Sequence, residues 1–136
     1  VIDAYVLPWR FIYQSTSQLL DSGTYNPQTY NVANLDSSSA VYTNQYLRVG
    51  SVVTVSGRVD VNPTSTATST SMGIDIPIVS NFTNSTQCCG TAFASGISGQ
   101  GAAILSDEGN DRAELKFVAS DVTDQPMYYT FTYRIL

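Results

Sequence analysis

The sequence predicts an all-β protein, an antiparallel β-sandwich of the jelly-roll type with about eight strands. Three observations support this fold class. Charged residues make up only 12% of the chain, while serine, threonine, asparagine, glycine and tyrosine are abundant. Several segments alternate apolar and polar residues with a period of two, the pattern of a strand with one buried face. Turn-forming residues separate these segments, and no segment shows a convincing helical period.

The clearest strand pattern lies in residues 41–61, which we expect to form a β-hairpin. One face of its second strand carries Val53, Val55, Val59 and Val61, and the other carries Thr54, Ser56, Arg58 and Asp60. A two-residue loop would place Arg48 beside Val53 and mix the faces. We therefore predict a three-residue loop, residues 49–51, with Gly50 in the left-handed conformation. This register pairs Leu47 with Val53 and Val41 with Val59, buries Leu47, and leaves Arg48 on the open face. Gly57 should mark a bulge or a close contact within the sheet.

Residues 1–22 are predicted to form an extended N-terminal arm and linker, and residues 23–136 the jelly-roll domain. The first thirteen residues are apolar and β-prone, but Pro8 excludes a central strand position. Left in water, this segment would be an apolar patch of the kind that monomers avoid. We expect it to be buried between subunits, the alternative being an edge strand within its own chain. The candidate interface residues are Val6, Leu7, Trp9 and Phe11.

The rest of the domain reads as strands joined by polar loops. Residues 23–35 predict a strand with Pro27 near its start or on a sheet edge. Later strands are expected within residues 72–79, 89–96, 97–106, 112–120 and 127–136. In residues 112–120 the alternation places Ala113, Leu115, Phe117 and Ala119 on the buried side.

Composition and charge exclude several classes of function. The formal net charge is −5, with six lysines and arginines and no basic run, so no nucleic-acid partner is expected. No apolar run approaches the roughly 18 residues of a membrane span, so no membrane insertion is expected. Without histidine, the Ser-His-Asp and Cys-His arrangements cannot be built. We therefore expect a protein that is not an enzyme, with no catalytic residues and no cofactor.

Two local features leave alternatives open. Asp107, Glu108 and Asp111 are spaced loosely like a calcium loop but lack its full ligand series, so an ordinary turn without a metal is expected. Cys88 and Cys89 are neighbours in the chain and too close for an ordinary disulfide. We expect two reduced thiols, with an intersubunit bridge or metal binding as alternatives.

Recognition is expected to come from three polar loops, residues 36–39, 62–71 and 80–87, because binding residues are often carried by loops on a rigid scaffold. The candidate receptor-contact residues are Ser38, Thr66, Asn81, Phe82, Asn84 and Gln87. Phe82 is the one large apolar residue of its loop and could stack on a sugar or a protein. Its alternative role is to pack beneath its own loop.

Four motifs together resemble the C-terminal domains of bacteriophage tail-fibre and virion spike proteins. They are G-T-Y-x-P at residues 23–27, Y-x-R-V-G-x-V-V-x-V-S-G-R-V at 46–59, I-x-I-P-I at 74–78, and P-M-Y-Y-T-F-T-Y at 126–133. The resemblance covers residues 23–136. The chain departs from the commonest pattern by carrying Tyr25 where tryptophan is frequent, and by its adjacent cysteines.

The resemblance implies a virion-surface domain, usually a homotrimer, that attaches the particle to a host cell through a surface glycan or protein. Such a domain would join other virion proteins through its N-terminal arm and be assembled in the bacterial cytoplasm. One alternative is a purely structural domain for capsid decoration or trimerisation. Another is a fibre tip that degrades polysaccharide.

Overall fold

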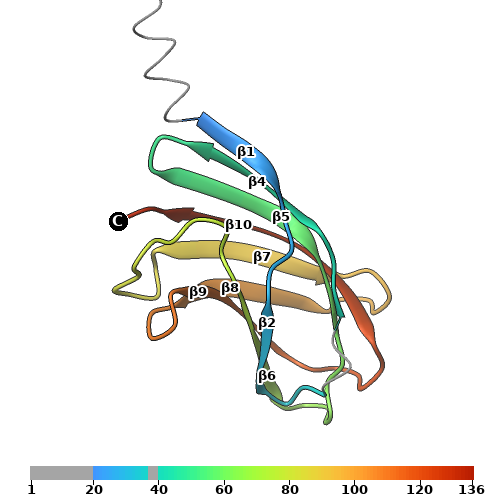
Figure 1. Ribbon diagram of the computed structural model, residues 1–136. Helices are drawn as coiled ribbons and strands as arrows, with labels where there is room; N and C mark the ends of the chain where they lie inside the picture. Colours follow the sequence, from blue (N-terminus) through green and yellow to red (C-terminus); the bar gives the residue numbers. More distant parts are fainter. Residues whose placement is uncertain (1–19, 37–39) are drawn as a thin grey trace, which may run out of the picture.

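The computed structural model describes residues 20–36 and 40–136, and this part of the chain forms a single antiparallel sheet of ten strands without a helix (Figure 1). The strands are β1 (Leu20–Tyr25), β2 (Thr29–Ala33), β3 (Ala40–Val41), β4 (Asn44–Val49), β5 (Val52–Val61), β6 (Ser69–Ile74), β7 (Cys88–Ala94), β8 (Gly101–Asp107), β9 (Arg112–Val118) and β10 (Gln125–Arg134). Their order across the sheet is β1-β4-β5-β10-β7-β8-β9-β6-β2, with the short β3 also paired to β5. Within the described residues there is accordingly no helix that could cross a membrane.

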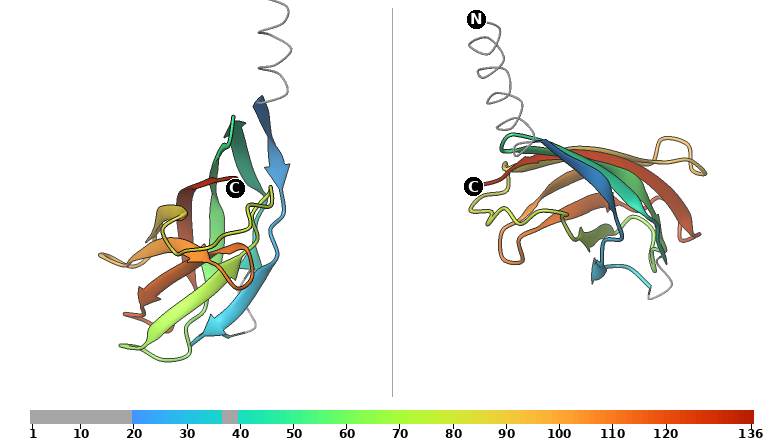
Figure 2. Two further views of the ribbon diagram at one scale, coloured as in Figure 1. Left: turned by 90° about the vertical axis from the view of Figure 1, so that its left-hand side faces the viewer. Right: turned by 45° about the horizontal axis from the view of Figure 1, so that its top comes forward.

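The sheet curls into a half-barrel because the chain connects its two edges directly. β1 and β2 stand at opposite ends of the strand order, yet only residues 26–28 separate them. At this corner the Tyr25 hydroxyl donates to the carbonyl of Asp75 at 3.1 Å, and the Asp75 N–H donates to the carbonyl of Gln28 at 3.0 Å. Figure 2 shows the sheet arching over itself. This architecture confirms the predicted antiparallel, jelly-roll-like β-sandwich, whose corners are made by strands that change sheets at bends.

The concave side of the arch holds the hydrophobic core. β5 and β10 are the longest strands and lie side by side in the order, with Phe131 opposite Val55 and Tyr133 opposite Val53. All four of these side chains are buried, as are Val59 and Val61. Burying each such aliphatic or aromatic side chain contributes about 1.5–3 kcal/mol. The predicted inward positions of residues 112–120 are confirmed, since Ala113, Leu115 and Phe117 of β9 and Ala119 just after it are all buried.

The predicted register of the central hairpin is wrong by one residue. Val49 pairs with Val52 and Arg48 with Val53, so the loop contains two residues, Gly50 and Ser51. Leu47 therefore stands opposite Thr54 on the outer face, with half of its surface exposed. Arg48 takes the inward position, where its Nε donates to the carbonyl of Gly50 at 2.8 Å. Because the arginine side chain is long, its charged group reaches the turn at the end of the hairpin, and the charge is not buried in the core.

Other features of the hairpin follow the prediction. Gly50 has a φ of 61°, the left-handed conformation that suits a tight turn. Val41 pairs with Val59, although through the separate strand β3. Gly57 marks a close contact, because a Cβ at this position would overlap the Asn44 side chain.

Two strand boundaries differ from the sequence prediction. Residues 23–35 form two strands, because Pro27 lies in the break between β1 and β2, and both strands are sheet edges. β6 begins at Ser69, inside the segment predicted as a loop up to residue 71. The expected boundary near Ser22 falls inside β1, where Ser22 pairs with Leu47. The arm residues Val6, Leu7, Trp9 and Phe11, and the loop residue Ser38, lie outside the described residues.

Candidate functional site

The convex side of the arch presents a row of polar side chains that runs across five strands. Strand register places Thr24 beside Gln45, Gln45 beside Ser56, Ser56 beside Thr130 and Thr130 beside Thr91. The next row contains Arg58, Tyr128 and Phe93. Because strand residues alternate between the two faces, the strands that bury the core valines and aromatics also project these groups outward. The result is an outer face rich in hydroxyl, amide and aromatic groups.

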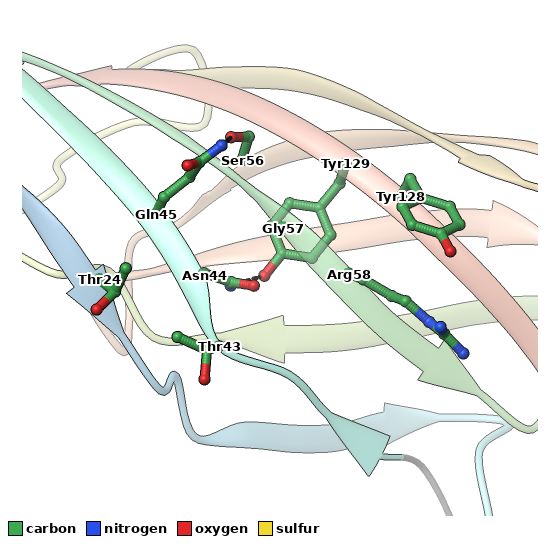
Figure 3. Close-up of a pocket in the computed structure, with 9 residues that line it drawn as sticks. All are labelled: Thr24, Thr43, Asn44, Gln45, Ser56, Gly57, Arg58, Tyr128 and Tyr129. Carbon is green, nitrogen blue, oxygen red and sulfur yellow. Dashed lines mark hydrogen bonds between the residues drawn. The ribbon is translucent and has the colours of Figure 1, made fainter.

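A groove of about 480 Å³ lies in this face where β1, β4, β5 and β10 meet (Figure 3). Thr24 lines it from β1, Thr43 from the position just before β4 and Gln45 from β4. Arg58 lines it from β5 and Tyr128 from β10. Its volume falls in the range of about 300–1,000 Å³ that is usual for small-molecule sites. Two further hollows share residues with it. One extends it past Ser22 and Leu47, and the other extends it from Tyr128 to Phe93.

Arg58 is the cationic group of the groove, and its position is fixed by three neighbours. Its Nε and Nη2 donate to the two carboxylate oxygens of Asp60 at 2.8 and 3.0 Å. The guanidinium carbon lies 4.3 Å from the centre of the Tyr42 ring and 5.6 Å from that of Tyr128, both within reach of a cation–π attraction. The Tyr42 hydroxyl also donates to Asp60, at 2.7 Å. The guanidinium plane is thus oriented before any ligand arrives.

The electrostatics of this cluster follow from the Asp60 carboxylate. The hydrogen bond to Asp60 raises the pKa of Tyr42, and the hydrogen bonds from Arg58 to Asp60 raise the pKa of the guanidinium. Both groups therefore hold their protons throughout the neutral pH range. The side chain of Asp60 is only 10% exposed, whereas that of Arg58 is 33% exposed and open to the groove.

Beneath the groove floor, the strands pack closely around Asn44. Its amide donates to the hydroxyl of Tyr129 on the core side, and both side chains are buried. Burial raises the pKa of Tyr129 to about 12. The Asn44 Oδ1 atom has no hydrogen-bond partner in the described part of the chain. The Asn44 side chain fills the space that a side chain at position 57 would need. Position 57 therefore cannot hold a residue larger than glycine unless Asn44 moves.

The hydroxyl groups of the outer face also bond to one another. Gln45 Nε2 donates to Ser56 Oγ at 3.1 Å, and the hydroxyls of Thr54 and Thr132 lie 3.2 Å apart. Each hydroxyl both donates and accepts, so these groups can bind a polyhydroxylated ligand without burying an unpaired charge. No group of three histidine, cysteine, aspartate or glutamate side chains suited to a metal occurs among residues 20–36 and 40–136. The chemistry offered by this face is hydrogen bonding and ring stacking.

The predicted contact loops do not converge on one site. Residues 62–68 connect β5 to the first residue of β6, and residues 75–87 follow the last residue of β6. The loop that carries Thr66 and the segment that carries Asn81, Asn84 and Gln87 therefore start from opposite ends of that strand. The Phe82 ring is 5% exposed and packs edge-on against Tyr133, with 5.8 Å between ring centres. This placement agrees with its alternative role of packing beneath its loop. The side chains of Asn84 and Gln87 bond within the loop, to Thr86 and Thr83 respectively.

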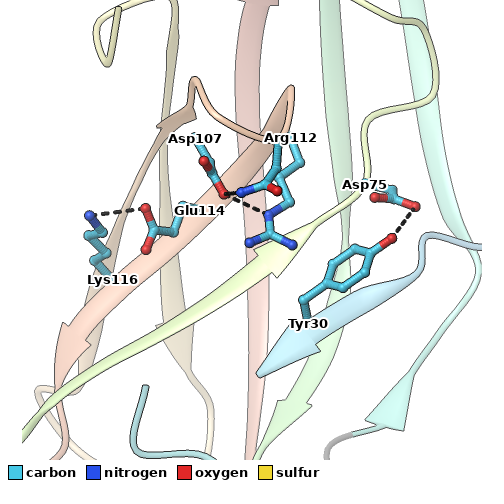
Figure 4. Close-up of polar contacts among 7 residues, drawn as sticks. Tyr30, Asp75, Asp107, Arg112, Glu114 and Lys116 are labelled. Carbon is cyan, nitrogen blue, oxygen red and sulfur yellow. Dashed lines mark hydrogen bonds and ion pairs between the residues drawn. The ribbon is translucent and has the colours of Figure 1, made fainter. Parts of the chain in front are cut away.

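The turn at residues 107–111 uses its carboxylates to hold the protein together. Asp107 accepts hydrogen bonds from Asn110 and from Arg112 Nε, each at 2.8 Å (Figure 4). Burial alone would raise the pKa of Asp107, but these hydrogen bonds outweigh it and lower the pKa. Asp111 accepts from the backbone N–H groups of Ser80 and Phe82 at 3.1 and 2.9 Å.

Arg112 extends this network across the opposite end of the sheet. Its guanidinium lies 4.5 Å from the centre of the Tyr30 ring, and the Tyr30 hydroxyl reaches Asp75 (Figure 4). The neighbouring β9 residues Glu114 and Lys116 form an ion pair at 3.0 Å. These charges are paired with one another, so this patch is interpreted as structural.

The two cysteines are free, with Cys88 buried and Cys89 exposed, and burial raises the pKa of Cys88 to about 12.

The fold can be compared with known proteins. The structure matches that of the reovirus attachment protein sigma1, solved in complex with alpha-2,3-sialyllactose, with a TM-score of 0.50. The chain shares its fold with a viral attachment protein. The match covers 86% of this chain and 67% of that chain at 14% sequence identity, which shows the fold alone. It gives no support to a bacteriophage family in particular. No protein-family model matches the sequence, and no curated protein matches it.

Proposed function

We propose that this chain is a virion-surface domain that attaches the particle to a host cell by binding a glycan in the groove around Arg58. The observation that carries the proposal is the composition of that groove, where an oriented guanidinium and the exposed Tyr128 ring stand among amide and hydroxyl groups. The shared fold with a viral attachment protein that was solved with a bound oligosaccharide supports it.

The physical fit is to a sugar. A pyranose has an apolar C–H face and a rim of hydroxyls, and Tyr128 offers a ring that is 51% exposed beside the hydrogen-bonding groups of Gln45 and Ser56. Tyrosine provides rigid, amphipathic contact area at a low cost in conformational entropy. A protein partner would require a larger contact than this groove provides, about 800 Å² per side in a standard interface.

A glycan array and a cell-adsorption assay with the purified chain test this proposal. We expect binding to a defined set of glycans, and Tyr128→Ala should weaken it about tenfold, the value of an aromatic contact worth about 1.4 kcal/mol. Val79→Ala is the matched control, because Val79 is at least as exposed as Tyr128 but lines none of the three hollows. Unchanged adsorption by Tyr128→Ala would rule out the groove. The absence of any glycan or cell binding would favour the purely structural alternative.

We further propose a homotrimer that joins other virion proteins through residues 1–22. Supporting this, Leu20, Val49 and Val52 stand opposite one another on the outer face, next to Leu47, and all four are exposed. An apolar strip of this kind suits an interface between subunits. Light scattering on the full chain should give three times the mass of one chain, and a monomer would contradict the trimer.

The domain is proposed to bind without catalysing a reaction, on a particle whose host is bacterial. Among the described residues that line the groove there is no carboxylate pair of the kind that acid–base hydrolysis requires, and the nearby carboxylate of Asp60 is engaged by Arg58. Incubation with host-surface polysaccharide should therefore leave the polymer length unchanged, as measured by size-exclusion chromatography. A shortened polymer would revive the degrading fibre tip.

A further inference from the structure

Asp60 occupies one edge of the Arg58 guanidinium. The two groups form the side-on pair in which Nε and Nη2 each meet one carboxylate oxygen, so this edge is closed to any ligand. The Nη1 group makes no hydrogen bond to the described residues and belongs to the open edge. A planar guanidinium has five N–H donors, so the open edge still offers several to a ligand.

The charges around this open edge are already balanced. Arg58 is neutralised by Asp60, which accepts hydrogen bonds from its Nε and Nη2 at 2.8 and 3.0 Å. The formal charges of this pair sum to zero, and the whole chain carries a formal net charge of −5. A second anion brought to the groove would therefore meet a site without excess positive charge.

From this geometry we propose that the groove selects uncharged glycans and discriminates against sugars that carry a carboxylate. The inference rests on the proposed glycan-binding function and names the class of ligand. The open edge of Arg58 donates to hydroxyl, ring or acetamido oxygens, while Tyr128 packs against the sugar ring and Gln45 and Ser56 bond to its rim.

A carboxylated sugar could gain from Arg58 only at a cost. To take the side-on position it would displace Asp60, whose side chain is 10% exposed and would keep only the hydroxyl of Tyr42 as a partner. Removing one partner from a largely buried charge is strongly unfavourable. If the sugar used the open edge instead, its carboxylate would lie near the Asp60 carboxylate, and the two negative charges would repel each other.

Matched pairs of glycans test the inference, each pair differing by one acidic sugar. Lactose and 3′-sialyllactose form one pair, and neutral array hits with their sialylated or uronic-acid counterparts form the others. Titration calorimetry at low salt should show the neutral member binding about five- to tenfold more tightly, as expected for one like-charge contact at partial exposure. The difference should shrink as salt is raised. Tighter binding of the acidic members would overturn the inference and leave the proposed function standing.

A charge-neutralising variant sharpens the test. Asp60→Asn should reduce or reverse the preference for neutral members, because Arg58 is then left without its counterion. Glu108→Gln is the control, since it changes the net charge equally but lies on the exposed turn between β8 and β9. A preference that Asp60→Asn and Glu108→Gln alter equally would show that the overall charge, and not the pair, sets the selectivity. If Asp60→Asn fails to fold, the wild-type pairs still decide. Binding of neither member of any pair would overturn both the inference and the proposed function.

Discussion

A single methyl group added at Gly90 should disrupt the centre of the sheet. Gly90 lies on β7 and pairs with Phe131 on β10, the strand that carries much of the core. A Cβ at Gly90 would lie 2.6 Å from Phe131 Cα, and closer still to the carbonyl oxygen of Thr130 and to Phe131 Cβ. Because two of these three atoms are backbone, the strands themselves would have to move apart.

The expected cost can be estimated from overpacking, which destabilises by about 1–3 kcal/mol. The clash with backbone places Gly90→Ala at the upper end, offset by about 0.5–1 kcal/mol because alanine is intrinsically better than glycine inside a strand. A net loss of about 2 kcal/mol corresponds to a fall in the melting temperature of about 6–10 °C for a domain of this size.

Urea and thermal unfolding followed by circular dichroism provide the assay. Gly101→Ala is the matched control on the adjacent strand β8, because its Cβ would meet only the Ala92 carbonyl oxygen at an ordinary 3.7 Å. We expect the free energy of unfolding of this control to lie within about 0.5 kcal/mol of the wild-type value, or above it. Equal stability of Gly90→Ala and Gly101→Ala would refute the close approach of β7 and β10.

Three further predictions concern the core and the acid response. Val55→Asp should cost about 4 kcal/mol or more in urea unfolding, because it buries an unpaired charge; a loss under about 1 kcal/mol would place Val55 outside the core. Phe82→Ala should cost about 3–5 kcal/mol while the folded fraction keeps its glycan affinity; a stable variant with lost affinity would make Phe82 a contact residue. Asp107 has a lowered pKa in the folded state, so its contribution is present above its ordinary pKa of 3.8 and is lost as the pH falls through the folded value. The difference in unfolding free energy between the wild type and Asp107→Asn should therefore shrink from about pH 6 to about pH 2, and a constant difference would contradict the assignment.

The sequence predicted the fold class and most strand positions because the period-two pattern of β5 and β9 matches their burial. It could not predict the hairpin register. Matching the apolar faces of the two strands favoured a register that buries Leu47. The tight Gly50-Ser51 turn instead sets the pairing, and the Arg48 side chain is long enough to reach the Gly50 carbonyl from its inward position. Nor could it show that residues 23–35 cross from one sheet edge to the other, since Pro27 is compatible with either an edge or a break.

The site was harder to predict than the fold. The composition of the loops pointed to Phe82 as a contact residue, but its side chain is buried in the core. The groove is instead formed by strand residues that face outward. Part of the signal was present, because Ser56 and Arg58 were expected on the open face of the hairpin. What the sequence could not supply is the strand order that brings Thr24 and Tyr128, more than a hundred residues apart in the chain, to the two sides of that hairpin.

The central claim, that the groove on the outer face binds the glycan, is tested most directly by mapping amide chemical shifts. The isotope-labelled chain is titrated with a neutral glycan identified on the array. If the groove binds the glycan, the largest changes should cluster at Gln45, Ser56, Arg58 and Tyr128 and saturate with a single affinity. Changes confined to residues 62–68 or 80–87, with the four groove residues unmoved, would contradict it.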